Sequence, residues 1–136
     1  MASLYLTHCT YKKDNKLQRT GEIVSPDRLY TGVKINRFIN RCKQVGVKWA
    51  IFSDLYGVWF PYEKHGYYEK HPSEVTDSEF RELLQASIDR LKKYDAVYFY
   101  GNHKSHYFHG LYKKLIRGLR NEGINVIKIS HLYDIE

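Results

Sequence analysis

Residues 47–57 read VKWAIFSDLYG, and this stretch decides the fold. An almost entirely apolar run ends at Ser53 and Asp54, and Gly57 then allows a sharp turn. A short apolar run bounded by turn residues is typical of a strand that is buried on both faces. We therefore expect a strand over residues 47–52, with reactive polar side chains at its carboxyl end.

The rest of the chain alternates between strand and helix patterns. Further strands are expected at residues 3–8, 95–100 and 124–129, and helices at residues 33–45, about 76–93 and about 106–121. Thr31 is the expected N-cap of the first helix, and Thr76-Asp77-Ser78-Glu79 matches a capping box. This alternation predicts one α/β domain over residues 1–136, with three layers, a mostly parallel four-stranded sheet and helices on both faces. Residues 9–31 and 53–75 are expected to be long loops, which in compact domains are usually functional or mobile.

Composition narrows the class of protein. The net charge is +7, which favours a polyanionic partner, although a solvated lysine-rich surface explains it equally well. The two cysteines form no disulfide framework, and no apolar stretch has signal-peptide or membrane-spanning length. We therefore expect a cytoplasmic protein, with Cys42 in the core.

The first strand ends in a thiol that is followed by cationic side chains. Cys9 comes directly after the strand, and Lys12 and Lys13 follow shortly. Cations lower the pKa of a nearby thiol and increase its reactivity, which makes Cys9 a candidate nucleophile. Two alternatives stay open: the loop, with Thr10, binds a phosphate, or it simply ends a strand. The absence of a glycine-rich phosphate motif argues against a Walker-type NTPase.

The strand at residues 47–52 ends in a carboxylate. Asp54 is poorly placed for packing but well placed to accept a hydrogen bond from a nucleobase or ribose, or to orient water. Glu63 is a candidate partner for it in acid–base chemistry, whereas an Asx-turn at Asp54 is the alternative. Tyrosine rings near a basic surface can stack on bases, although an aromatic loop packed over the sheet edge is an equal alternative. The neighbouring candidate ligand-binding residues are Ser53, Tyr56, Gly57 and Tyr62.

The third strand ends at Gly101, Asn102 and His103, which are candidates for holding a phosphate or ribose. Histidines recur there every third residue, at positions 103, 106 and 109. Three such steps drift around a helix, and no cysteine or carboxylate completes the set, so no metal site is expected. The alternative is anion binding at the start of the following helix.

Together these motifs resemble the small archaeal, bacterial and phage domains grouped as DUF6884. The matching features are the tip with Cys9, Lys12 and Lys13, LYTG at residues 29–32, WAIFSDLYG at residues 49–57, PYE at residues 61–63, and Gly101. The run through Ser53, Gly57 and Pro61 is also similar to the central domain of archaeosine synthase, a tRNA-modifying protein with a uracil-DNA-glycosylase-like fold. Asp54-Leu55 departs from the pattern of a small residue followed by Lys or His, and so does His8 before Cys9. The resemblance implies a Rossmann-like or uracil-DNA-glycosylase-like domain associated with nucleotides or modified nucleobases.

The leading hypothesis is an enzyme without a cofactor that acts on a nucleobase, nucleotide or tRNA by glycosidic or base-modifying chemistry. Asp54 would be its acid–base or base-reading carboxyl, and Cys9 a nucleophile or a thiol in the site wall. Phosphate or ribose would be held by Lys12, Asn102 and His103, and the base would be contacted by Tyr30, Tyr56 and Tyr62.

The main alternative is a non-catalytic basic module that binds nucleic acid through helix surfaces. Its candidate residues are Lys34, Arg37, Arg41, Lys113, Lys114, Arg117 and Arg120. A third hypothesis is a homo-oligomer that associates through residues 56–68.

Overall fold

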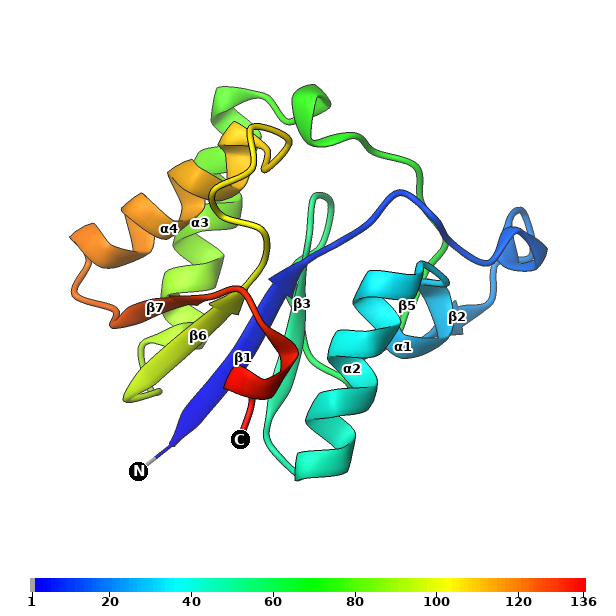
Figure 1. Cartoon of the computed structure of the whole chain (residues 1–136). Coiled ribbons are helices and arrows are strands. Elements are labelled where there is room, and N and C mark those ends of the chain that lie inside the picture. Colours follow the sequence, from blue (N-terminus) through cyan, green and yellow to red (C-terminus); the bar gives the residue numbers. More distant parts are fainter. Residues whose placement is uncertain (1) are drawn as a thin grey trace.

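The computed structural model describes residues 2–136 and shows an α/β fold built on one five-stranded sheet (Figure 1). The strand order is β4-β3-β1-β6-β7. These strands are β1 (Ser3–His8), β3 (Trp49–Ser53), β4 (Gly57–Trp59), β6 (Ala96–Tyr100) and β7 (Val126–Ile129). All are parallel except β4, which runs antiparallel to β3.

The expected mostly parallel sheet is confirmed, but the expected number of four strands is wrong. Gly57 has a φ of 74°, a left-handed conformation that reverses the chain directly after β3. Residues 57–59 then pair back onto β3, with Ser53 opposite Gly57 and Ile51 opposite Trp59. The glycine that we expected to make a turn therefore opens a hairpin and adds an edge strand.

Helices cover both faces of this sheet. Helix α2 (Val33–Val45) packs on one face, and α3 (Asp77–Leu91) and α4 (Gly110–Asn121) pack on the other (Figure 1). Side chains along β1 point alternately to the two faces of the sheet. Leu4 and Leu6 therefore join the core under α3 and α4, whereas Tyr5 joins the core under α2. Cys42 is fully buried in the α2 core, as expected.

The two long connections are partly ordered and are joined to each other. The first contains a 3₁₀ turn (Asn15–Leu17), β2 (Ile23–Val24) and α1 (Pro26–Leu29). The second contains β4, β5 (His65–Gly66) and another 3₁₀ turn (Pro72–Glu74), and a third such turn (Leu132–Asp134) lies near the carboxyl end. Strands β2 and β5 pair antiparallel, so the expectation of plain loops is wrong.

Helix α2 begins at Val33 and α3 follows Thr76, as predicted, whereas the N-cap of α2 and the start of α4 differ from the prediction. Thr76 caps α3 through the expected capping box with Glu79. Helix α2 has Gly32, not Thr31, as its N-cap. Helix α4 begins at Gly110, because the backbone of His109 is extended and its ring nitrogen accepts a hydrogen bond from the Leu111 N–H. No helix within residues 2–136 combines the length and apolar character needed to cross a membrane.

The strand order reverses around β1. From β1 the chain crosses through α2 to β3 on one side, and it later crosses through α3 to β6 on the other side. Open α/β sheets bind ligands beyond the carboxyl ends of their strands, near such a reversal. The residues that follow β1 and β3 are therefore where a site is expected.

Candidate functional site

Cys9 and Asp54 meet at the carboxyl ends of β1 and β3, beside a tyrosine from α4. The Tyr112 hydroxyl donates a hydrogen bond of 2.8 Å to Asp54 Oδ1 and lies 3.7 Å from the Cys9 Sγ. All three side chains are buried, and Asp54 is only 2% exposed. The parallel pairing of β1 with β3 places the two strand ends side by side, which is why residues far apart in sequence converge.

Burial makes Asp54 an unusual carboxyl group. It raises the pKa of Asp54 above its ordinary value, because removal from water disfavours the charged form. The Tyr112 hydroxyl, the Cys9 thiol and the charges of His109 and Lys13 act in the opposite direction, but the pKa stays raised. Asp54 makes no salt bridge within residues 2–136. A buried carboxyl with a raised pKa is suited to hold a proton and donate it.

The lowered thiol pKa that we expected for Cys9 is not found. Burial and the neighbouring Asp54 carboxyl raise the pKa of Cys9 to about 12. Lys12 is exposed, and Lys13 points toward the tyrosines rather than forming an ion pair with the sulfur. Cys9 is therefore a protonated thiol in the wall of the site, and the interpretation as a ready nucleophile is wrong for this arrangement.

A chain of hydroxyl groups lies behind Cys9. Tyr30 and Tyr68 share a hydrogen bond of 2.5 Å, and Ser53 Oγ donates to the Tyr68 hydroxyl over 3.0 Å. Ser53 Oγ also accepts the N–H groups of Leu55 and Tyr56, which fixes the turn after β3. Tyr30 and Ser53, which were predicted to bind a ligand, therefore support the site from behind Cys9.

Lys13 is the one buried cation of this region within residues 2–136. It is 9% exposed, and its ammonium nitrogen lies 4.6 Å from the centre of the Tyr68 ring. Burial lowers its pKa, while the Cys9 and Asp54 groups counteract that effect through their charges. The ammonium group donates a hydrogen bond of 3.4 Å to the Tyr11 carbonyl.

The site opens into a pocket of about 300 Å³ above Cys9 and Asp54. Most of its wall consists of aromatic rings and imidazoles, and His8 stacks on Tyr112 with ring centres 4.4 Å apart. The lining residues that matter most here are His8, Thr10, Tyr11, Lys70, His71, Tyr107 and His109. Thr10 Oγ1 is buried there without a hydrogen-bond partner within residues 2–136.

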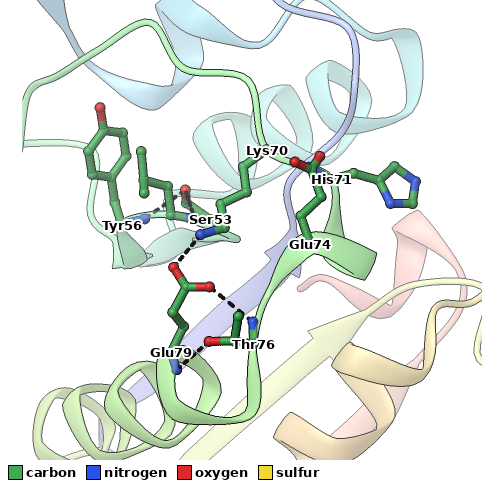
Figure 2. A network of polar contacts seen from close by, with 8 residues as sticks. Ser53, Tyr56, Lys70, His71, Glu74, Thr76 and Glu79 are labelled. Carbon is green, nitrogen blue, oxygen red and sulfur yellow. Dashed lines mark hydrogen bonds and ion pairs between the residues drawn. The ribbon is translucent and has the colours of Figure 1, made fainter.

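One wall of the pocket is the segment before α3, which is held by polar contacts (Figure 2). Lys70 pairs with Glu79 of α3 at 2.5 Å, and Glu79 also accepts the Thr76 N–H at 3.0 Å. His71 caps the following 3₁₀ turn together with Glu74. In Figure 2 Lys70 reaches down to Glu79, and His71 points away on the other side of the segment.

Glu63 does not join Asp54. Both of its carboxylate oxygens bind Arg90, Oε2 at 2.5 Å and Oε1 at 3.0 Å, and Oε1 also accepts the Phe60 N–H. Arg90 lowers the pKa of Glu63, so this carboxylate is a charged structural group. The hypothesis of a catalytic pair of carboxylates is therefore wrong.

Other predicted ligand residues lie outside the pocket. Tyr56 bonds the Gly66 carbonyl and stacks on His65, and Tyr62 is 75% exposed and stacks on Phe60. Gly57 forms the hairpin turn, and Asn102 is exposed and does not line the pocket. Gly101 has a packing role, since an added Cβ would lie 2.9 Å from the Phe108 ring.

The histidines after β6 diverge. His103 donates a hydrogen bond of 2.7 Å to the Phe99 carbonyl, the His106 ring lies tilted against that of Tyr107, and His109 caps α4. Across residues 2–136, no group of three His, Cys, Asp or Glu side chains is arranged to hold a metal ion.

The predicted nucleic-acid residues fall on opposite faces of the sheet. Lys34, Arg37 and Arg41 belong to α2, with Arg41 donating to the Ile135 carbonyl. The other face carries the four predicted residues of α4, which are Lys113, Lys114, Arg117 and Arg120. There Lys114 contacts Asp77, and Arg120 contacts the Val126 carbonyl. They therefore cannot form one continuous surface.

Sequence reasoning missed Tyr112, Tyr68, Lys70 and His71. Tyr112 had a signal, because it lies three residues before Leu115 and seven before Leu119 on the apolar stripe of α4 and is the one hydroxyl-bearing residue of that helix. The others come from an irregular segment whose position no local pattern gives. Comparison of the chain with protein-family models, curated proteins and solved structures finds no match.

Proposed function

We propose that the protein is an enzyme that acts on a nucleobase held in the pocket above Cys9 and Asp54, and that it cleaves or forms an N-glycosidic bond. The observation that carries this proposal is the buried Asp54 carboxyl, hydrogen-bonded by Tyr112 at the floor of an aromatic pocket. A volume of about 300 Å³ is at the lower end of ligand pockets and suits a base or a nucleoside.

The chemistry of this pocket fits a departing base. Aromatic walls stack on the flat faces of a base regardless of its edge pattern. The raised pKa of Asp54 favours a protonated carboxyl, which can donate its proton to a ring nitrogen of the base. In the hydrolytic direction the bond between that base and C1′ breaks as the proton moves from Asp54 to the base. Water then adds to C1′, and the proton that it releases returns to the Asp54 carboxylate. The Rossmann-like or uracil-DNA-glycosylase-like architecture and the resemblance to DUF6884 belong to the same proposal.

Tyr112 is a positioning residue in this scheme. Its hydroxyl donates to Asp54 Oδ1, which orients the carboxyl and lowers its pKa. Removing that hydroxyl should raise the pKa of Asp54 further, so the acid form should persist to higher pH. A Tyr112→Phe variant should therefore move the alkaline limb of the pH–rate profile upward, which loss of packing alone would not do.

The test is release of free base from a panel of nucleosides and short single-stranded oligonucleotides, followed by mass spectrometry. Asp54→Asn should lower the rate by about a hundredfold or more, because one positioned acid contributes about that much. The matched control is Asp27→Asn, since Asp27 is a carboxylate paired with Lys43 far from the pocket wall. Asp54→Asn and Cys9→Ala variants that both keep the full rate would contradict the proposal. So would tight binding of a base with no turnover, which would indicate a binding module.

A further inference from the structure

We propose that the substrate is a single-stranded nucleic acid and that a backbone phosphate of this strand binds a second, cationic pocket between α4 and β7. This inference rests on the proposed function for its base-binding half. The second pocket has a volume of about 350 Å³. Its cationic lining consists of Lys113, Arg117, Arg120 and Lys128.

The cations of this pocket lack acidic partners. All six salt bridges found within residues 2–136 lie elsewhere, and none includes these four side chains. Lys114, the neighbour that faces α3, does contact Asp77. Glu122, the nearest acid along the chain, is exposed and makes no ion pair in this part of the structure. All four side chains are exposed, and like charges gathered around one hollow attract an anion through their summed field.

His103 lies in the positive electrostatic field of the cationic pocket. Burial lowers its pKa, and the charges of Lys128 and Arg120 lower it further. Its Nε2 donates a hydrogen bond to the Phe99 carbonyl. Nδ1 is buried and has no hydrogen-bond partner within residues 2–136. Two N–H groups of Arg120 donate hydrogen bonds to the Val126 carbonyl, which fixes the guanidinium group in place.

The two pockets are connected through the ring of Phe108. Phe108 lines the cationic pocket, where its ring centre lies 4.8 Å from that of His103. On its other side the Phe108 ring lies 5.6 Å from His8 and 6.0 Å from Tyr112, which both line the base pocket. A chain that places a base in one pocket therefore has an adjacent place for its phosphate.

A single strand fits this arrangement better than a duplex. A base inside a duplex is stacked and paired, so it can enter a pocket only after an unfavourable extrusion, which a single strand avoids. Cationic grooves beside aromatic side chains are the general means of binding single strands. The proposal predicts that a strand binds more tightly than its isolated nucleotides.

The test measures binding of a fluorescent single-stranded RNA of about 12 nucleotides, and of the same DNA, by anisotropy at several salt concentrations. Arg117→Glu/Lys128→Glu should weaken binding at least tenfold and reduce the slope of log K against log salt by about 1.4, the value expected for two lost phosphate contacts. The matched control is Arg37→Glu/Lys48→Glu, which changes the net charge equally at exposed positions away from both pockets. It should change the affinity less than threefold.

Three outcomes would overturn the inference. These are equal weakening by the control variant, equal affinity for a duplex of the same sequence, and equal affinity for a mononucleotide. Melting curves identify any misfolded variant, and Arg117→Ala/Lys128→Ala then replaces it with a smaller expected loss. Because strand binding is measured without turnover, Asp54→Asn should still bind. Loss of base release with intact strand binding would therefore concern the proposed function and leave this inference standing.

Discussion

The proposed role of Asp54 comes at a cost to stability. A buried carboxyl without a cationic partner in contact destabilises the folded state whenever it is charged. Cores normally exclude such groups, and they occur at sites where a perturbed proton affinity is useful. The stability of the protein should therefore depend on pH through the protonation of Asp54.

We predict that Asp54→Asn raises the melting temperature by a few degrees at pH 7 while abolishing activity. The folded state binds the Asp54 proton more tightly than the unfolded state does, so stability falls as the pH rises from the ordinary value of 3.8 through the raised pKa. Asp54→Asn removes this pH-dependent loss of stability, so the difference in melting temperature between the variant and the original protein should vanish below about pH 4. Thermal melts of both proteins between pH 3 and pH 8 measure this difference, and a difference that does not depend on pH would argue against a raised pKa for the buried Asp54.

How much of the site could be predicted depends on which element supplies each residue. Cys9 and Asp54 could be predicted because each directly follows an apolar strand, and parallel strands bring such positions together. Glu63 could not be excluded from sequence, because its partner Arg90 is 27 residues away on another element. The state of the Cys9 thiol also needs three dimensions, since sequence shows the nearby lysines but not the burial that raises its pKa to about 12.

At the scale of the element, helix starts decide where the pocket walls stand. The capping box of Thr76 and Glu79 begins α3, and the same Glu79 holds Lys70 of the pocket wall. Thr31 looks equivalent in sequence, but its neighbour Gly32 is the N-cap of α2. The pattern S/T-x-x-E distinguishes the two, because Thr31 has no acidic residue three positions later.

We predict that Thr76→Ala lowers the free energy of unfolding by about 1 kcal/mol, through loss of the hydrogen bond that the Glu79 N–H donates to the Thr76 Oγ1. The matched substitution Thr31→Ala should change it by less than about 0.5 kcal/mol, because the exposed Thr31 side chain caps nothing. Urea denaturation of both variants gives the comparison. Equal losses at the two positions would mean that the cap does not stabilise α3.

At the scale of the whole molecule, the sheet separates two kinds of surface. The core under α3 and α4 and the core under α2 lie on opposite faces, so the basic residues of α2 and α4 point in different directions. Sequence predicted the sheet and both layers, because alternation along the strands and helical periods are local. It did not predict that residues 9–31 and 53–75 join through β2 and β5, because that pairing spans more than forty residues.

This architecture predicts an uneven pattern of amide hydrogen exchange. The inner strands β1, β3 and β6 have paired neighbours on both sides and should exchange most slowly. The two-stranded β2–β5 pair and the 3₁₀ turns at residues 15–17 and 72–74 should exchange fastest among the ordered elements. A single-stranded oligonucleotide should then slow exchange in residues 67–76 and around the start of α4, which border the base pocket, and leave α2 unchanged. Protection confined to α2 would place the binding surface on the wrong face of the sheet for the site that Cys9 and Asp54 define.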